Sequence, residues 1–425
     1  MKSKAGSRLQ DLSWILTLFG TAVGAGILYL PLQAGLASIW ALVFLSVLVF
    51  PLIYFSHKNI LQLLISAARP VDYSAAAAHN FGKSFGFVIM AVFLITFYAV
   101  LFSYAVGLNA NLGKYLVDLG FTESNWSKGP FLSLIIMTAF ALLHFIGRKT
   151  ILRVMSAVTL FLIVFLFCIS VYLIPLWNLS VFTQVPSFYS FIDDVLLVLP
   201  ILTFSFVFFP AMSSMVISFR NQDGTLPNYA RPRLEYILLK TSALLLLFVL
   251  LFVYSCILSL TPDEFEYAIQ KNLNCLTILS YKQGVSPALA NVGPLVGIGA
   301  LFTSFAGVLF AVKESAYEFT VSIVSYFNGG HWILNNRKNA EICILVFIFL
   351  TLWIVTIINP SVIHIFGLFI APLVAIFLFI LPVVILIKQN GLYVLKRPSC
   401  MFVLLTGILI LFSYELGTLF KVHHL

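Results

Sequence analysis

The chain is 425 residues long, 61% of its residues are hydrophobic and only 9% are charged. Its mean hydropathy of +1.06 excludes a soluble or disordered protein and predicts a membrane protein with many spans. The net charge of +9 is not gathered in a basic folded domain, which excludes a nucleic-acid-binding protein, and we attribute it to Lys and Arg residues that lie beside anionic headgroups.

Long apolar runs between charged or Pro- and Gly-rich breaks predict an all-α membrane protein with eleven transmembrane helices. Several runs exceed the roughly 20 residues that a bilayer requires, which predicts tilted, broken or protruding helices. In chain order the predicted spans are residues 12–33, 36–56, 85–113, 130–147, 152–175, 191–219, 234–260, 289–313, 341–358, 362–387 and 399–418.

The distribution of basic residues predicts the orientation. With a cytoplasmic N-terminus, 19 of the 24 Lys and Arg residues fall in cytoplasmic segments, so the positive-inside rule predicts a cytoplasmic N-terminus and an external C-terminus. Of the five cysteines, only Cys275 is expected outside, and no disulfide is predicted.

The first span carries the most unusual stretch, residues 20–26 with the sequence GTAVGAG. Each glycine costs a helix interior roughly 1 kcal/mol, so this span is predicted to unwind at mid-membrane depth. Unwound backbone in a membrane must line a polar cavity or be buried in protein. Such a break is typical of a transporter site, although Gly20 and Gly24 at G-x-x-x-G spacing also favour simple helix packing.

The third span offers aromatic side chains that either line a pocket or pack in the core, with Phe97 and Tyr98 the candidates for a pocket. The sixth span is the second unusual helix, because Pro200 and Pro210 bracket Thr203 and Ser205. Each proline removes a backbone donor, so this helix is also predicted to break near mid-depth; the alternative is a proline kink.

Spans one and six each open a block of five spans, and an odd number of crossings starts the second block from the opposite side of the bilayer. This spacing predicts an inverted repeat with one broken helix per half, the arrangement of many secondary transporters. The predicted units are residues 1–175 and 176–390, with the eleventh helix and C-terminus in 391–425.

Span eight presents oxygen ligands on one helical face. Ala300 and Thr303 lie one turn apart, next to Ser304, and such oxygens suit a small cation. The alternative is that the hydroxyls bond to carbonyls of their own helix. Because the spans hold no His-rich cluster, nucleophile elbow or acidic pair, we do not expect an enzyme.

Six segments of the chain match one known family in order. The most specific is the first helix, 14–35 (WILTLFGTAVGAGILYLPLQAG). The others are 50–57 (FPLIYFSH), 198–214 (VLPILTFSFVFFPAMSS), 255–262 (SCILSLTP), 304–307 (SFAG) and 351–361 (TLWIVTIINPS). Together they resemble the hydroxy/aromatic amino acid permeases, and in particular the serine/threonine branch. That family belongs to the amino acid/polyamine/organocation superfamily and implies the five-plus-five inverted repeat of the bacterial leucine transporter.

This resemblance implies a bacterial inner-membrane transporter whose amino acid substrate binds at the two broken helices. The carboxylate is expected at the positive half-helix end, the ammonium at backbone carbonyls, and the side chain against spans three, six and eight. The implied substrate-binding residues are Thr21, Ala22, Val23, Gly24, Ala25, Gly26, Tyr98, Thr203, Phe204, Ser205 and Phe206.

The chain departs from the serine branch at polar positions. Relatives carry Asn-His-Ser where this chain has Val207-Phe208-Phe209, Lys in place of Thr303, and His in place of Val308. The Ala-x-x-Thr-Ser pattern resembles instead the sodium-binding face of sodium-coupled members of the wider fold. The implied sodium ligands are Ala22, Val23, Ala300, Thr303 and Ser304.

We therefore expect a symporter, driven by Na⁺ or H⁺, that imports a serine- or threonine-like amino acid by alternating access. An alternative within the fold is a permease for aromatic or other hydrophobic amino acids, and an alternative of another class is a non-transporting amino acid sensor. We expect no cofactor beyond the coupling ion and no obligatory protein partner.

Overall fold

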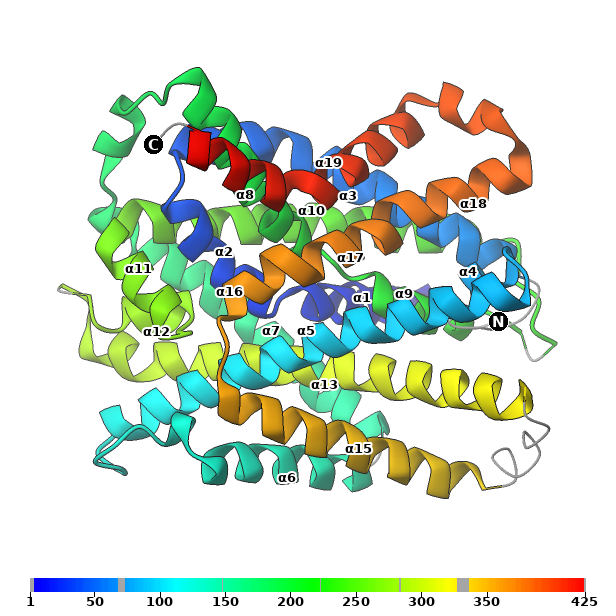
Figure 1. Ribbon diagram of the computed structural model, residues 1–425, viewed down its shortest axis with the longest axis horizontal. Coiled ribbons are helices and arrows are strands. Elements are labelled where there is room, and N and C mark those ends of the chain that lie inside the picture. The colour runs from blue at the N-terminus through cyan, green and yellow to red at the C-terminus, as the bar shows by residue number, and fades with distance from the viewer. Residues whose placement is uncertain are drawn as a thin grey trace.

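The computed structural model describes residues 4–67, 73–146, 148–221, 223–282, 284–326 and 336–423. Helices build this part of the chain, and it contains no β-strand. Figure 1 shows the long helices running along the longest axis of the molecule, with α1 and α2 in the middle of the bundle, α6, α13 and α15 along one edge, and α3, α18 and α19 along the other.

The α-helices have the following bounds: α1 Lys4–Ala22, α2 Ala25–Gly35, α3 Ile39–Ser66, α4 Tyr73–His79, α5 Lys83–Asp118, α6 Pro130–Ile146, α7 Arg148–Tyr172, α8 Phe188–Phe204, α9 Phe209–Ser218, α10 Ala230–Ser259, α11 Pro262–Gln270, α12 Cys275–Leu279, α13 Pro287–Tyr326, α15 Arg337–Ile358, α16 Val362–Ile365, α17 Ala371–Ala375, α18 Leu381–Asn390 and α19 Pro398–His423. Short 3₁₀ turns lie at Trp126–Lys128, Ile174–Leu176, Leu179–Thr183 and Leu392–Lys396, and π-helical turns at Phe366–Ile370 and Ile376–Ile380.

Every predicted span coincides with a helix or an interrupted helix. Among the described residues, seven helices are long and apolar enough to cross a membrane, and the bent pair α1–α2 makes an eighth. Shorter apolar helices lie at Pro130–Leu142, Ala157–Tyr172 and Pro398–Ser413. The exact number of eleven crossings and the inverted repeat therefore stay predictions.

Both unusual spans are interrupted where their glycines and prolines predict. The first bends by 47° between α1 and α2. In the second, α8 ends at Phe204 and α9 begins at Phe209, so four residues leave the helix in the middle of a 31-residue span.

A further irregularity lies in the span formed by α16, α17 and α18, which contains two π-helical turns. Pro372 and Pro382 each follow one of these turns, at the N-terminal end of the next α-helical piece. Because proline has no N–H, the chain before it widens to a longer hydrogen-bonded ring instead of breaking.

The surfaces of α6 and α15 suit a lipid environment. Phe131 is 72% exposed, Phe347 67% and Ile354 56%, which would be costly in water but is favourable against acyl chains. The helices around the two breaks are buried instead, since 78% of the most apolar window of the α8–α9 span is inside the protein.

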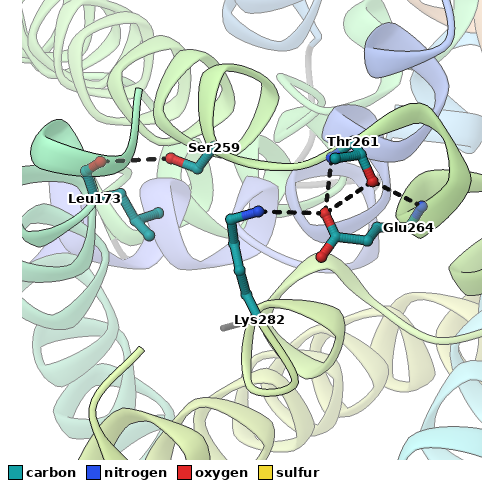
Figure 2. A network of polar contacts seen from close by, with 5 residues as sticks. All are labelled: Leu173, Ser259, Thr261, Glu264 and Lys282. Atoms are coloured by element: carbon teal, nitrogen blue, oxygen red, sulfur yellow. Dashed lines mark hydrogen bonds and ion pairs between the residues drawn. The ribbon is translucent and has the colours of Figure 1, made fainter. Parts of the chain in front are cut away.

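At one end of the bundle α11 and α12 form a compact cap (Figure 2). The Thr261 side chain accepts a hydrogen bond from the Glu264 amide at 3.4 Å, and the Glu264 carboxylate accepts from the Thr261 amide at 2.7 Å, which is a capping box. Lys282, beyond α12, reaches the same carboxylate at 3.5 Å. Nearby, the Ser259 hydroxyl donates to the Leu173 carbonyl at 3.5 Å, tying the end of α10 to the residue after α7.

Candidate functional site

The two broken helices touch each other at their breaks. Gly26, in the first turn of α2, lies so close to the end of α8 that a Cβ atom there would stand 2.7 Å from the Ser205 Cα and 3.1 Å from the Phe204 ring. Only a glycine fits against a backbone atom at this distance. The break in one span is therefore in direct contact with the break in the other.

The α1–α2 break releases backbone donors from the helical ladder. Val23 still donates to the Phe19 carbonyl at 2.8 Å, and the ladder resumes only where Leu28 donates to the Gly24 carbonyl at 3.3 Å. No side chain caps the start of α2. The first amides of a helix carry partial positive charge, so this point of the molecule is suited to a carboxylate.

Ser304 of α13 connects the first break to the opposite side of the bundle. Its hydroxyl donates to the Val23 carbonyl at 3.2 Å. A Cβ on Gly24 would lie 2.0 Å from the Ser304 Oγ and 3.6 Å from the Tyr104 hydroxyl. Three elements, α1–α2, α5 and α13, thus meet around Gly24.

The predicted cation ligands are partly assembled in this arrangement. The Val23 carbonyl and Ser304 hydroxyl are in contact, whereas the Thr303 hydroxyl donates to the Ala300 carbonyl of its own helix at 2.9 Å. A hydroxyl that donates in this way keeps lone pairs for a cation. Ala22 is buried at the end of α1, next to Val23.

The hydroxyls of the second break behave differently from one another. The Ser205 hydroxyl, directly after α8, donates to the Ile201 carbonyl of α8 at 2.7 Å. In the first broken span, the Thr21 hydroxyl of α1 donates to the Thr17 carbonyl at 2.8 Å. The Thr203 hydroxyl is buried and has no hydrogen-bond partner in the described part of the chain. An unpaired buried hydroxyl is costly, and among the hydroxyls predicted to bind the substrate Thr203 is the one that donates to no group in the described part of the chain.

Tyr98 does not lie with the other predicted residues, because its hydroxyl donates to Thr351 of α15. The tyrosine of α5 near the break is Tyr104, which is 4% exposed and approaches Gly24. A signal for this face was present in the sequence: Tyr104, Gly107 and Asn111 are spaced by three and four residues, the period of one helical face. The structure places this face toward the first broken span. Tyr104 approaches Gly24, and Gly107 and Asn111 lie against the Tyr29 hydroxyl of α2.

Beyond the site, the end of the bundle that carries α11 and α12, here called the far side, is closed by an asparagine network around Tyr29, Asn111, Asn272 and Asn274. Asn111 accepts from the Asn274 amide at 2.9 Å, and the Tyr29 hydroxyl donates to the Asn272 carbonyl at 2.9 Å. Asn272 also bonds to the Pro360 carbonyl at 2.9 Å and the Val362 amide at 3.0 Å. This network fastens the α11–α12 connection to α2, α5 and the start of α16.

The other end, where α1 begins, is here called the N-side, and it is closed by charge and by aromatic packing. Arg233 of α10 donates to the Asp11 carboxylate of α1 at 2.6 Å, and its guanidinium lies 4.9 Å from the centre of the Phe219 ring, just after α9. The aromatic packing is that of Phe209, at the start of α9, against Tyr73 and Phe97, with ring centres 5.2 and 5.6 Å away. Both ends of the bundle are thus covered around the two breaks.

Comparison with known proteins gives a consistent family. The model of the tryptophan/tyrosine permease family matches residues 12–416. The serine transporter SdaC of Escherichia coli K12 is 28% identical over 388 residues, which cover 89% of this chain and 88% of that protein. The threonine/serine transporter TdcC of Yersinia enterocolitica is 27% identical over 96% of this chain and 95% of its own length, and the inner membrane transport protein YqeG of E. coli K12 is 28% identical over 88% of this chain and 90% of its own length.

Solved transporters share the fold. Mhp1, a nucleobase-cation-symport-1 family transporter in a closed conformation with bromovinylhydantoin bound, has a TM-score of 0.53 at 13% identity, and the match covers 96% of this chain and 91% of Mhp1. MhsT in complex with L-phenylalanine has a TM-score of 0.50 at 17% identity, with 96% and 98% covered. At these identities the likeness shows the fold alone.

Proposed function

The chain belongs to the tryptophan/tyrosine permease family, and from this premise we propose that it is a secondary transporter that imports an amino acid by alternating access. The observation that carries the proposal is the contact between the two helix breaks at Gly26 and Ser205. It places the helix-end donors of α2 against the end of α8, the helix that also carries the buried, unpaired Thr203 hydroxyl. Both lie inside a membrane bundle, where a zwitterion can bind without water.

In the proposed complex, the substrate carboxylate accepts hydrogen bonds from the amides that open α2, from Gly24 to Gly26, and from the Tyr104 hydroxyl. The ammonium group donates to carbonyls at the end of α8 and to Thr203. The breaks fit this division because the N-terminus of a half-helix carries positive partial charge and a C-terminus negative. Thr21, Ala22, Val23 and Ala25 shape the first break, and Phe204, Ser205 and Phe206 the second.

We propose Na⁺ as the coupling ion, bound as a co-substrate by oxygens of α1 and α13. Val23 and Ser304 already meet, and the carbonyls of Ala22 and Ala300 with the Thr303 hydroxyl would complete a shell of oxygen ligands, the kind that hard cations prefer. An ion at this position neutralises the carbonyl ends of α1 and so favours the conformation that binds the substrate. Proton coupling is the alternative.

The substrate is proposed to be serine- or threonine-like, because the relatives SdaC and TdcC are a serine transporter and a threonine/serine transporter. One observation favours an aromatic or other hydrophobic substrate as the second candidate: Phe204, Phe206 and Phe208 are all nearly inaccessible around the second break. These rings could surround an apolar side chain that replaces part of their mutual packing.

The orientation is proposed from the basic residues: the N-side faces the cytoplasm, and the far side, with its asparagine network, faces outward. In this orientation the pair formed by Arg233 and Asp11 closes the cytoplasmic end. The units 1–175 and 176–390 are proposed as the two inverted halves, with 391–425 outside the repeat.

The experiment is a thermal-shift screen of the purified protein with each of the twenty amino acids, with and without sodium, followed by counterflow in proteoliposomes. A ligand that binds the folded state raises its melting temperature, so we expect one chemical class of amino acid to do so, and more strongly with sodium. A Ser304→Ala variant should lose the sodium effect. Protein that binds an amino acid but shows no counterflow would contradict transport, and uptake indifferent to sodium would contradict the ion site.

A further inference from the structure

A fully buried histidine lies against the second helix break. His57 of α3 has no exposed surface. Its ring stacks on Phe208, the last residue before α9, with ring centres 3.8 Å apart and planes 19° apart, and the Phe209 ring centre is 6.4 Å away. The imidazole thus contacts the segment that interrupts the span.

The hydrogen bonds fix the protonation state of this ring. Its Nδ1 lies 2.9 Å from the Ile53 carbonyl, which can only accept, so Nδ1 carries a proton. Its Nε2 lies 3.3 Å from the Phe208 amide nitrogen, which can only donate, so Nε2 is an acceptor. Only the neutral imidazole with its proton on Nδ1 satisfies both contacts.

The Phe208 amide is one of the donors that the break removes from the helical ladder, and the histidine supplies its acceptor. A proton added at Nε2 would face this N–H with another N–H and abolish the bond. It would also place a charge beside phenyl rings, which stabilise a cation only partly. The protonated ring therefore disfavours the arrangement of α8, α9 and α3 seen here.

Charged and titratable groups lie on the helices that pack around His57, and within the described ranges the hydrogen bonds and ring contacts of the imidazole are with Ile53, Ser56, Phe208 and Phe209 instead. They include Tyr29 on α2, Tyr54 and Lys58 on α3, Tyr73 and His79 on α4, Asp193 and Asp194 on α8, Arg220 after α9, Arg231, Arg233, Glu235, Tyr236 and Lys240 on α10, Lys388 on α18 and Cys400 on α19. Several of them bind other groups: Lys58 pairs with Glu235 at 3.9 Å, Tyr73 donates to the Phe377 carbonyl at 2.6 Å, and Arg220 donates to the Leu64 and Ala67 carbonyls at 3.0 and 2.8 Å.

We infer that His57 is a proton-binding site that controls the second helix break: the neutral ring holds the start of α9 against α3, and the protonated ring releases it. Release of α9 opens the N-side half of the broken span. The inference rests on the proposed alternating-access function, which gives α9 a movement to control, but it does not depend on which amino acid is carried or on sodium.

The test reads the opening of α9 through a cysteine. Ser213 of α9 is 6% exposed and its hydroxyl has no partner in the described part of the chain, so Ser213→Cys, in a background whose five native cysteines are replaced by alanine, is a conservative reporter. Its rate of reaction with N-ethylmaleimide is measured in purified, reconstituted protein from about pH 8 to about pH 5. Because only the thiolate reacts, each rate is divided by the rate of an exposed cysteine at the same pH, which corrects for the thiolate fraction. We expect the corrected rate to rise about tenfold as the pH falls, because the acceptor at Nε2 is lost. A corrected rate that does not change with pH would overturn the inference.

Two substitutions separate the roles of the ring nitrogens. His57→Gln places an amide oxygen near the Nε2 position and cannot take up a proton, so labelling should stay slow at every pH. His57→Asn provides a donor near Nδ1 but does not reach Phe208, so labelling should be fast at every pH. The control is His79→Gln, because His79 is an exposed histidine at the end of α4, and it should keep the response of the unmodified protein.

A pH response that survives in His57→Gln would overturn the assignment, since another group would then be responsible. If His57→Gln does not fold, judged by its elution on gel filtration, the His57→Asn variant and the pH response of the parent still decide. No substrate is added, so the labelling result stands apart from the transport assay: a protein that shows the His57-dependent response and no counterflow contradicts the proposed function alone.

Discussion

At the scale of single residues, the site depends as much on missing side chains as on present ones. Gly24 and Gly26 allow backbone from one broken helix to lie against Ser304 on one side and Ser205 on the other. The contacts differ in kind, since Gly24 meets a side chain that could move slightly, whereas Gly26 meets a Cα atom that cannot. The functional cost of adding a methyl group should therefore be greater at Gly26.

We predict that Gly26→Ala abolishes or strongly reduces transport. The added Cβ would stand 2.7 Å from the Ser205 Cα, and separating the two breaks to relieve this contact should cost about 1–3 kcal/mol. The measurement is counterflow together with the melting temperature. Gly299→Ala on α13 is the matched control, because a Cβ there meets nothing within 4 Å; if both variants lose transport equally, the contact between the breaks is not the reason.

A second prediction concerns the tyrosine that reaches the break. Tyr104→Phe removes a hydroxyl that is close to Gly24 and should weaken binding of the amino acid about three- to tenfold, the value of one hydrogen bond, with little change in stability. Affinity is measured by isothermal titration. Tyr98→Phe, which removes a hydroxyl bonded to α15, should leave the affinity unchanged; a loss of affinity there and not in Tyr104→Phe would reverse the assignment.

At the scale of elements, the sequence allows the two interrupted helices to be predicted, because glycine and proline change the backbone itself. The glycines of residues 20–26 lie around the first interruption, and Pro200 in α8 and Pro210 at the start of α9 bracket the second. The rotation of a buried helix is harder to predict: α5 has apolar residues on all sides, so its hydrophobicity does not distinguish Tyr98 from Tyr104, and only the spacing of Tyr104, Gly107 and Asn111 does. The π-helical turns before Pro372 and Pro382 were also not predicted, since proline alone does not distinguish a kink from a wider turn.

The cross-helix partner of Ser304 could not be found from sequence for a similar reason. A serine in a helix most often bonds to its own carbonyls, as Ser205 and Thr303 do. Ser304 bonds to Val23 only because α13 and the break of α1 pass each other at that depth. Residue type and spacing thus identify candidate ligands, while the packing of helices decides which of them meet.

The asparagine network is a property of elements, and its removal should open the far side. Asn272 has a positive φ of 54°, so Asn272→Gly keeps the backbone conformation while removing the side-chain bonds to Pro360 and Val362. We predict about a tenfold increase in labelling of Cys275, which is fully buried at the start of α12, by a membrane-impermeant maleimide. Thr183→Ala, at an exposed site, is the control; unchanged labelling of Cys275 in Asn272→Gly would show that the network does not hold the cap.

At the scale of the whole molecule, two different closures lie on either side of one contact between the breaks. The far side is closed by neutral hydrogen bonds between loops and helix ends, and the N-side by an ion pair and by aromatic rings in edge-to-face contact. Such a division is what alternating access would need, because each closure can open while the other holds, and the breaks between them are free to follow either movement.

The last prediction tests this independence with the ion pair. Asp11→Asn removes the charge of the carboxylate that lies 2.6 Å from the Arg233 guanidinium, in an ion pair whose two side chains are partly buried. The N-side end of α1 should therefore separate from α10, and labelling of a Ser213→Cys reporter should rise several-fold. Labelling of Cys275 on the far side should fall or stay the same, because in the proposed alternating access the far side is closed while the N-side is open. Asn272→Gly should give the reverse pattern. If Asp11→Asn exposes both reporters together, the two ends are loosened as one body and the bundle does not alternate.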